Sequence, residues 1–319
     1  MRAIVVESGE MLLGEVPEPV LREGDLLVQV RAAGVNRADL LQRLGRYPPP
    51  PGESETIGLE VSGEVLRGAG AFQPGDRVMA LLAGGGYAER ARVPAAQALR
   101  IPQGMGFAEA AVVPEAFLTA WLNLMMLGRL APGEIAVVHA AASGVGTAAL
   151  QLCRGVAKVV LATASPGKHQ ALLALGATHV LGREEVPLRL AEAVQAAAGR
   201  GADLIFDLVG GAYLEANIAA LGLHGRLTCI STLSGAKGTL DLGALLGKRL
   251  TLLGSTLRSR SAAQKEKLVR SFAEEALPRF ARGELRPVLA RTFPLSEALA
   301  AHTALERSEV IGKVALLAE

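Results

Sequence analysis

The residues with the clearest chemical potential form a glycine turn near the middle of this 319-residue chain. A β-branched apolar run at 135–139 leads into small residues, and an Ala- and Leu-rich helical pattern follows at once. Strand, tight turn and helix in this order place a helix N-terminus where it can bind a pyrophosphate. Gly144 can take a positive φ, and Gly146 lets the helix approach the strand or a phosphate closely. The predicted dinucleotide-binding residues are Ala142, Ser143, Gly144, Val145 and Gly146, and the alternative is a βα turn without a ligand.

The residues after the next apolar run, 159–163, indicate which dinucleotide binds. An NAD site carries an acid about 20 residues past the glycines, where it bonds the ribose 2′-OH. This chain has Ser165 and Lys168 there, and Arg183 follows the third strand. An acid would repel a 2′-phosphate, whereas a hydroxyl and two cations would bind it. The sequence therefore favours NADPH, although Lys168 could instead be a solvated lysine in a helix's first turn.

Composition argues against several classes of protein. The formal net charge is only +2, no long basic run occurs, and 3% of residues are aromatic, so neither nucleic-acid nor membrane-surface binding is expected. Cys153 and Cys229 each lie in an apolar pattern, which predicts small buried thiols and no disulfide framework. Residues 1–10 do not resemble a signal peptide, and the uncharged segment 135–153 suits a buried strand and helix better than a membrane span. We therefore expect a cytoplasmic protein.

Two different patterns of predicted secondary structure must position these residues. The first third of the chain carries short β-leaning runs punctuated by Gly and Pro, which predicts a compact, partly open barrel. These strands are expected at 3–7, 26–32, 60–66 and 77–80. Helices are expected at 107–113 and 115–127, with Pro114 dividing them.

From Gly133 onward, strands alternate with helices. Strands are expected at 135–139, 159–164, 179–181, 204–209, 226–231 and 251–256, and helices at 145–156, 168–175, 187–198 and 213–221. Such βα units predict a parallel sheet with helices on both faces. The tail does not continue this rhythm, so we expect it to return to the first domain. Its expected elements are a long helix at 262–282, strands at 288–293 and 313–317, and a helix at 297–306.

Several motifs, distributed nearly from end to end, resemble one family. Gly58-Leu59-Glu60-Val61-Ser62-Gly63 resembles the G-x-E-x-x-G motif of the medium-chain dehydrogenase/reductase superfamily. More narrowly, the chain resembles the zinc-free, zeta-crystallin-like quinone oxidoreductases, most of all the p53-inducible type. The strings that carry this resemblance are Asn36-Arg37-Ala38-Asp39, 45–50, Pro114-Glu115-Ala116, 140–146, Leu257-Arg258-Ser259-Arg260 and Ile311-Gly312-Lys313-Val314.

The resemblance implies an α/β fold with two domains. A GroES-like, β-rich catalytic domain would comprise 1–118 and the return segment 257–319, and a doubly wound, parallel-sheet Rossmann domain would comprise 119–256. The substrate would lie in the cleft between them. The resemblance also places Asn36, Tyr47 and Thr119 near the nicotinamide. Further cofactor contacts are expected from Val209, Ile230, Ser231, Leu257 and Lys313.

Among the three catalytic candidates, Tyr47 is our choice for contact with the substrate and for proton relay. The alternative is a loop tyrosine that packs on the neighbouring prolines. Asn36 could equally be a turn residue. One departure from the p53-inducible type affects the cofactor: Gly182 stands where that type has a tyrosine against the adenosine phosphate. The preference for NADP would then depend on Ser165, Lys168 and Arg183.

The resemblance predicts a site without metal. A zinc alcohol dehydrogenase similar to this chain would have Cys near Asn36, His at Leu59 and a four-Cys lobe downstream, but 84–92 contains no Cys. Catalytic zinc needs about three protein ligands, and the five histidines are scattered. Without a Lewis acid, alcohol oxidation lacks its usual means of forming an alkoxide, whereas reduction of an activated acceptor remains feasible.

The predicted function is that of a zinc-independent NADPH:quinone oxidoreductase, which transfers a hydride to a quinone or a similar activated carbonyl compound. One alternative is an NADPH-dependent enone or enoyl-thioester reductase on the same scaffold. A second is a non-catalytic, nucleotide-binding redox sensor. We also expect a homodimer in which an exposed sheet edge at 251–256 pairs across subunits.

Overall fold

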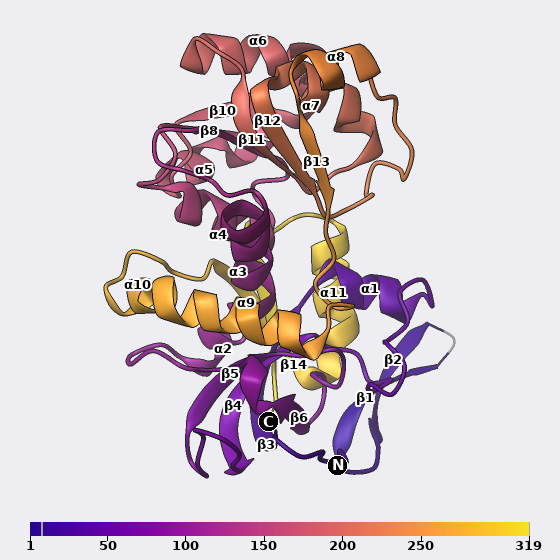
Figure 1. Ribbon diagram of the computed structural model, residues 1–319. Coiled ribbons are helices and arrows are strands. Elements are labelled where there is room, and N and C mark those ends of the chain that lie inside the picture. Colours follow the sequence, from indigo (N-terminus) through magenta and orange to yellow (C-terminus); the bar gives the residue numbers. More distant parts are fainter. Residues whose placement is uncertain (8, 319) are drawn as a thin grey trace. The chain divides into compact units, whose positions relative to one another are not determined.

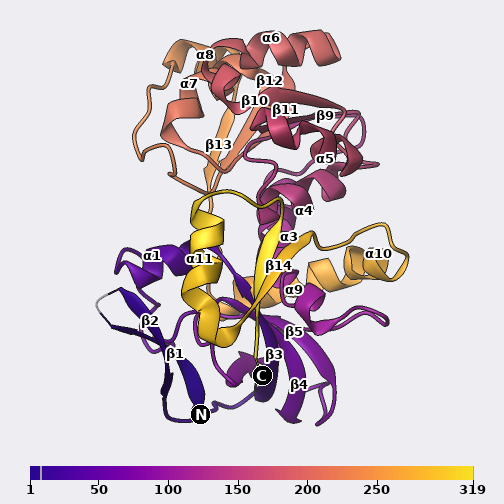
Figure 2. The ribbon, with the colours of Figure 1, turned by 180° about the vertical axis from the view of Figure 1, so that it is seen from behind.

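A computed structural model describes residues 1–7 and 9–318 and divides the chain into two compact units. Unit 1 consists of Met1–Leu118 and Leu257–Glu319, and unit 2 of Thr119–Thr256. Each unit has its own sheet and its own apolar core. Figure 1 shows the early (indigo) and late (yellow) parts of the chain in one unit, and Figure 2 shows the same from behind.

Unit 1 is built on a seven-stranded, mainly antiparallel sheet with the order β14-β15-β3-β4-β5-β7, and β6 also pairs with β3. Its strands are β3 (Asp25–Val35), β4 (Glu60–Arg67), β5 (Arg77–Leu81), β6 (Arg90–Pro94), β7 (Ala98–Arg100), β14 (Leu289–Pro294) and β15 (Lys313–Leu317). A separate pair is formed by β1 (Arg2–Glu7) and β2 (Glu10–Glu15). The alternating apolar residues Leu26, Val28 and Val30 of β3 enter the core, as the period of two in a strand requires.

The helices of unit 1 are α1 (Arg37–Arg43), α2 (Phe107–Ala110), the start of α3 (Pro114–Trp121), α9 (Ala262–Glu275), α10 (Leu277–Ala281) and α11 (Ala298–Glu306). Short 3₁₀ turns lie at Ala95–Gln97 and Leu295–Glu297. Ser261 caps α9, because its Oγ accepts from the Gln264 N–H at 3.3 Å while Gln264 accepts from the Ser261 N–H. The single helix expected at 262–282 is wrong: α9 ends before α10, which has Pro278 in its first turn.

Unit 2 contains a six-stranded, wholly parallel sheet with the order β10-β9-β8-β11-β12-β13. Its strands are β8 (Ile135–Val138), β9 (Val159–Ala164), β10 (His179–Gly182), β11 (Ala202–Asp207), β12 (Leu221–Cys229) and β13 (Thr251–Gly254). Every residue of β8 and β9 is buried, as is typical of parallel strands covered on both faces. This strand order is that of the doubly wound dinucleotide-binding fold, so the predicted α/β fold class is confirmed.

The helices of unit 2 follow its strands. They are α4 (Gly144–Cys153), α5 (His169–Ala174), α6 (Val186–Ala198), α7 (Leu214–Ala220) and α8 (Leu242–Gly247), and 3₁₀ turns lie at Pro166–Lys168, Arg183–Glu185 and Gly211–Tyr213. A π-helical stretch, Leu122–Leu127, continues α3, where the sequence predicts a plain α-helix to 127. Five further elements are not predicted from the sequence, because they are short and carry weak apolar periodicity: β2, β6, β7, α1 and α8.

The helical run Phe107–Leu127 is long and apolar enough to cross a membrane by length and composition alone. Its mean hydropathy is 1.5, and 78% of its most apolar stretch is buried inside the protein. Such burial is typical of a core helix.

Gly146 offers a test of the packing between α4 and the turn before it. A Cβ at this position would lie 2.6 Å from both the Ala140 carbonyl oxygen and the Ala141 Cα, which are backbone atoms that cannot rotate away. We expect Gly146→Ala to lower the free energy of unfolding by about 1–3 kcal/mol in denaturant titrations. Gly247→Ala on exposed α8, where an added Cβ meets nothing within 4 Å, should leave it unchanged or slightly higher. Equal effects of the two substitutions would contradict this account.

Candidate functional site

The charged centre of unit 1 is Lys313, whose side chain is 6% exposed. Its Nζ lies 2.8 Å from Glu60 Oε1, donates to the Val35 carbonyl oxygen at 2.6 Å, and donates to Asn36 Oδ1. An ammonium has three protons, so these three oxygens satisfy it. Asn36 Nδ2 also donates to Glu60 Oε1 at 3.0 Å, which closes the triad.

The sheet brings these three residues together from distant parts of the sequence. β15 pairs with β3 so that Val314 lies opposite Val35, and β4 pairs with the other side of β3. Lys313 and Glu60 thus begin the strands that flank the end of β3, and Asn36 follows that end directly. Gly34 leaves the space that the carboxylate needs, since a Cβ there would lie 2.2 Å from Glu60 Oε1.

Glu115, in the first turn of α3, extends this centre. Its backbone N–H donates to Glu60 Oε2 at 2.8 Å. Burial, and then the negative charge of Glu60, raise the pKa of the Glu115 carboxyl from 4.5 to about 8. The Glu115 side chain therefore carries a proton at neutral pH, whereas the fully buried Glu60 is charge-balanced by Lys313.

A second set of buried polar groups, linked by hydrogen bonds, begins at the backbone of Asn36. Asp39 Oδ2 accepts from the Asn36 N–H at 2.8 Å and from the Tyr87 hydroxyl at 2.9 Å, and that hydroxyl lies 3.2 Å from His302 Nε2. Burial raises the pKa of Asp39 from 3.8 to about 7 and lowers the pKa of His302 to about 3. These groups hold the backbone of Asn36 in place at the start of α1.

Tyr47 is fixed by Arg258, which is 5% exposed. The Arg258 guanidinium donates to the Tyr47 carbonyl oxygen at 3.0 Å, to the Ala83 carbonyl oxygen at 2.8 Å and to Gln42 Oε1 at 2.8 Å. It also lies 5.2 Å from the centre of the Tyr47 ring, within cation–π range. Burial and the charge of Glu115 raise the pKa of the Tyr47 hydroxyl, while Arg258 opposes this.

Glu115 therefore lies between the predicted residues Asn36 and Tyr47. Its backbone N–H binds Glu60, which accepts from the Asn36 amide, and its carboxyl contributes to the raised pKa of the Tyr47 hydroxyl. Thr119 lies one turn further along α3, buried, with its carbonyl oxygen accepting from Asn123 Nδ2 at 2.8 Å. The sequence predicts no site role for Glu60 or Glu115, whereas the resemblance implies that residues around Leu257 and Arg258 line the nicotinamide half. Each stood inside a motif that carried the resemblance, and this was the available signal.

In unit 2, the glycine turn forms the N-terminus of α4. Ser143 is the N-cap, and its Oγ accepts from the Gly146 N–H at 3.1 Å. Gly144 does not use its freedom to take a positive φ: it is the first helical residue, and Ala140 takes the left-handed conformation with φ 45°. Ala142, Ser143, Gly144 and Val145 thus lie at a helix end, where backbone N–H groups lack intrahelical acceptors.

The residues predicted to bind a 2′-phosphate follow two adjacent strands. Ser165 comes after β9, Lys168 ends the following 3₁₀ turn, and Arg183 comes after β10. Burial, and then the charge of Arg183, lower the pKa of Lys168, so the two cations lie within electrostatic reach of each other. Arg183 is exposed and donates to Glu184 Oε1 at 2.7 Å.

The other predicted cofactor residues fall into two places. Val209 follows β11, and Ile230 and Ser231 follow the adjacent β12, so they share the carboxyl edge of the parallel sheet, where ligands bind in such folds. Leu257 is buried in unit 1, and Lys313 lies in the triad described above. Of the two cysteines predicted to be buried, Cys153 is buried and Cys229 is partly buried.

The triad does not suit a zinc ion. Asn36 and the buried aliphatic Leu59 stand where a zinc alcohol dehydrogenase similar to this chain would have thiolate and imidazole ligands, and the Lys313 ammonium lies against both Asn36 and Glu60. Within residues 1–7 and 9–318, no group of three or more His, Cys, Asp or Glu side chains could hold a metal ion.

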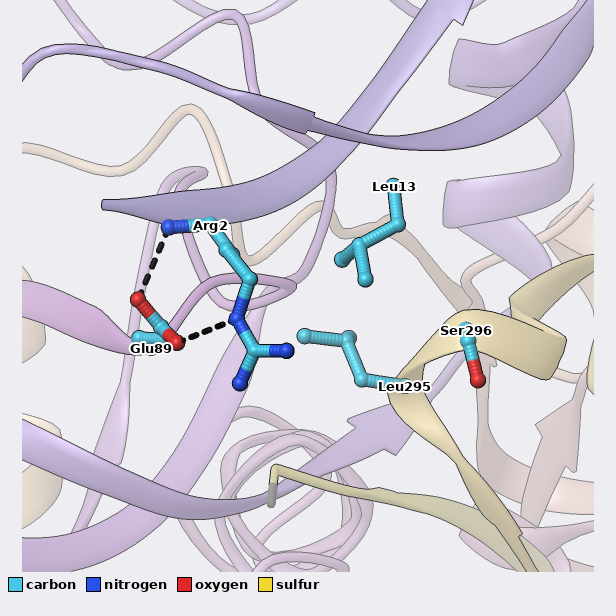
Figure 3. A pocket seen from close by; sticks show the side chains of 5 residues that line it. All are labelled: Arg2, Leu13, Glu89, Leu295 and Ser296. Atoms are coloured by element: carbon cyan, nitrogen blue, oxygen red, sulfur yellow. Dashed lines mark hydrogen bonds and ion pairs between the residues drawn. The ribbon is translucent and has the colours of Figure 1, made fainter.

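A small surface hollow in unit 1 lies apart from these predicted residues (Figure 3). Its volume of about 20 Å³ holds about one water molecule. It is lined by Arg2, Leu13, Glu89, Leu295 and Ser296, and Figure 3 shows Arg2 turned toward Glu89, to which its Nε donates at 2.6 Å. The hollow contains none of the predicted site residues.

Comparison with known proteins assigns the family. The family model "alcohol dehydrogenase GroES-like domain" matches residues 22–121, and "zinc-binding dehydrogenase" matches 144–274. The chain is 32% identical over 319 residues to the synaptic vesicle membrane protein VAT-1 homolog of Mus musculus, covering 94% of this chain and 78% of that protein. The chain belongs to the medium-chain dehydrogenase/reductase superfamily. It is accordingly an oxidoreductase.

Solved structures of the superfamily are similar over the full length. A mycobacterial protein, Rv1454c, solved in complex with NADPH, is 28% identical, with a TM-score of 0.88 and 99% coverage of both chains. The CurK enoyl reductase is 26% identical, with a TM-score of 0.87 and coverage of 100% of this chain and 99% of that chain. The GroES-like family model includes Glu60 and Glu115, and the second model begins at Gly144, within the glycine turn.

The buried Asp39 makes stability depend on pH. Its pKa is raised to about 7 in the folded protein, so the folded state binds the proton more tightly than the unfolded state does. The free energy of unfolding should then fall as pH rises from about 4 to about 7. Asp39→Asn should flatten this fall in chemical denaturation from pH 4 to 8, whereas Glu266→Gln, at an exposed site in the same unit, should not. A slope that is the same in wild type and Asp39→Asn would contradict the prediction.

Proposed function

We propose that the protein is an NADPH-dependent reductase of quinones and related activated carbonyl compounds, and that it works without a metal ion. The observation that carries this proposal is the Lys313 ammonium, enclosed by Asn36 and Glu60 at 2.8 Å from the Glu60 carboxylate. Lys313 thus places a side-chain cation against Asn36, near which a zinc alcohol dehydrogenase similar to this chain would have a Cys ligand. Acceptors that are already electron-poor need no Lewis acid, which favours quinones over alcohols.

The residues of unit 2 support binding of a phosphorylated dinucleotide. The α4 N-terminus with its Ser143 cap provides N–H groups for the pyrophosphate. Ser165, Lys168 and Arg183 would bind the 2′-phosphate, because two neighbouring cations gain from an anion placed against them. Val209, Ile230 and Ser231 at the sheet edge would contact the nicotinamide half, with Leu257. The similarity to a protein complexed with NADPH agrees with this choice of cofactor.

Tyr47 and Asn36 of unit 1 and Thr119, the first residue of unit 2, are proposed to contact the acceptor. NADPH, when bound, supplies a hydride. Arg258 orients Tyr47 through its carbonyl oxygen and ring, so that the phenol can donate a hydrogen bond to the acceptor oxygen. Lys313 and Glu60 fix the Asn36 amide, and Glu115 remains protonated nearby. The partly buried surroundings of Tyr47 strengthen each of these polar contacts.

A second candidate is reduction of enones or enoyl thioesters. The similarity to the CurK enoyl reductase over the whole chain favours it. Both reactions place negative charge on an oxygen conjugated to the carbon that receives the hydride, so the same residues would serve. A nucleotide-binding redox sensor without turnover is the third alternative.

Acceptor specificity separates these candidates. Initial rates of NADPH oxidation would be measured with 1,2-naphthoquinone, 1,4-benzoquinone and a 2-enoyl-CoA. We expect the highest kcat/KM with a quinone. A higher value with the enoyl-CoA would replace the first candidate with the second, and NADPH fluorescence quenching without oxidation of NADPH by any acceptor would favour the sensor.

The preference for NADPH should depend on Lys168. We expect Lys168→Ala to weaken NADPH binding by about tenfold while NADH binding stays unchanged, since it removes a charge-assisted contact to the 2′-phosphate. The control is Lys158→Ala. Lys158 is exposed and directly precedes the start of β9, whereas Ser165 and Lys168 follow the end of that strand. Both affinities can be measured by fluorescence titration. An unchanged NADPH to NADH ratio in Lys168→Ala would show that Lys168 has no phosphate role.

The homodimer also remains a proposal. β13 is the last strand of its sheet, and three of its four residues are exposed. An unpaired, accessible strand edge favours pairing with a second copy. A monomeric mass by light scattering would contradict it.

A further inference from the structure

Four buried polar side chains of unit 2 form a continuous hydrogen-bonded series, here called the His139 network. Its members are Thr163 in β9, His139 directly after β8, Asn217 in α7 and Asp207 at the end of β11. Each is at most 1% exposed. Three of them lie at the carboxyl ends of neighbouring strands, the edge at which ligands bind in such folds. Buried polar groups are costly unless they are satisfied, so a network of this size at this edge needs an explanation.

The hydrogen bonds of the His139 network run in one direction. A carboxylate can only accept, so Asn217 Nδ2 donates to Asp207 Oδ2 at 3.1 Å and Asn217 Oδ1 faces His139. His139 Nε2 lies 2.7 Å from that oxygen and therefore carries the proton. His139 Nδ1 is then the acceptor for the Thr163 hydroxyl, 3.0 Å away. Burial lowers the pKa of His139, which agrees with a neutral ring.

At its other end, the His139 network holds the backbone that follows β11. Asp207 Oδ1 accepts from the Val209 N–H at 2.6 Å and from the Gly210 N–H at 3.0 Å. The Asp207 carbonyl oxygen accepts from the Ile230 N–H at 3.0 Å. Val209 and Ile230 are two of the residues predicted to contact the nicotinamide half of the cofactor. One aspartate therefore fixes the backbone of both.

Gly210 couples this turn to the residues after β12. Its φ of 98° lies in the region that favours glycine. A Cβ at Gly210 would lie 2.6 Å from the Ser231 carbonyl oxygen and 2.9 Å from the Thr232 Cα. The turn after β11 thus packs directly against Ser231, a third residue predicted for the nicotinamide half. A displacement of the turn would disturb both contacts.

His139 also lies where the glycine turn begins. Its backbone N–H donates to the Phe206 carbonyl oxygen at 3.0 Å, and the next residue, Ala140, takes the left-handed conformation. The ring of Tyr213 packs edge-on against the His139 ring, with the ring centres 4.9 Å apart. His139 is therefore held on both its backbone and its ring. The network joins the start of the turn proposed to bind the pyrophosphate to the turn proposed to contact the nicotinamide.

We propose that His139 and Asn217 are positioning residues for the nicotinamide half of the cofactor, and that they act through Asp207 on the turn at 209–210. This inference rests on the cofactor placement in the proposed function and extends it to two residues that contact no ligand themselves. The network orients the Asp207 carboxylate so that both N–H groups of the turn stay bonded to Oδ1. The turn, and Ser231 against it, then keep one position.

The first test compares the binding of two ligands by isothermal titration calorimetry. They are NADPH and 2′-phosphoadenosine diphosphate ribose, the same dinucleotide without its nicotinamide. We expect Asn217→Leu, which leaves the His139 Nε2–H and Asp207 Oδ2 without a partner, to weaken NADPH binding about tenfold and binding of the nicotinamide-free ligand less than about twofold. His139→Gln should stay within about threefold of wild type for both ligands, because its amide again offers an N–H donor to Asn217.

The control for this comparison is Asp203→Asn. Asp203 lies near the opposite end of β11 and also accepts a backbone N–H, that of Ile135 at 2.7 Å. It should leave the ratio of the two dissociation constants unchanged. A role in folding alone would weaken both ligands alike, so equal weakening by Asn217→Leu, or none, would overturn the inference. If Asn217→Leu does not fold, Asn217→Ser, whose shorter side chain cannot reach both His139 and Asp207, decides by the same criterion.

The second test follows the direction of the network in the cofactor-free protein by ¹⁵N NMR. Wild type should carry the His139 proton on Nε2. In Asp207→Asn the amide oxygen must still face the two N–H groups of the turn, so its NH₂ group faces Asn217 and turns that amide over. The His139 proton should then move to Nδ1, whereas Asp203→Asn should leave it on Nε2. A proton that stays on Nε2 in Asp207→Asn would overturn the inference.

The two proposals fail in different ways. A wild-type protein that binds NADPH more tightly than the nicotinamide-free ligand but reduces no quinone or enone would contradict the proposed function and leave the inference standing. Equal binding of the two ligands by wild type would mean that the nicotinamide half contributes nothing to affinity. That result would overturn the inference, whatever the assays with acceptors give.

Discussion

The structure of unit 1 depends on one enclosed ion pair, Lys313 with Glu60. Their side chains are 6% and 0% exposed, and the pair joins the start of β15 to the start of β4 across the end of β3. Removing one partner of such a pair typically costs about 3–5 kcal/mol, since it leaves a buried charge uncompensated. The Asn36 amide takes its orientation from this pair, and burial, together with the negative charge of Glu60, raises the pKa of Glu115 to about 8.

The two units differ in the groups that they present to a charged ligand. Unit 2 presents backbone N–H groups at the α4 N-terminus and two cations after neighbouring strands, an arrangement suited to phosphates. Unit 1 places the Arg258 guanidinium against Tyr47 and encloses the Lys313 ammonium with Asn36 and Glu60. The proposed hydride transfer would draw on both units.

The sequence predicts most of the fold because many strands are short apolar runs; β9 of the parallel sheet and β15 of the unit 1 sheet have the predicted bounds. It misses β6, whose alternating arginines do not resemble a buried strand. The site was predictable only where motifs carried it, as at Asn36 and Tyr47. The contact between Arg258 and Tyr47 joins residues 211 positions apart, and local patterns contain no information on such pairs.

The central claim is that a side-chain cation, with no metal, supports reduction by NADPH. The most direct measurement is quinone-dependent NADPH oxidation by the purified protein before and after dialysis against a chelator, with the metal content determined on the same samples. The account predicts less than one zinc per ten chains and an unchanged kcat after dialysis. A kcat that falls on dialysis and returns when one equivalent of zinc is added would contradict it.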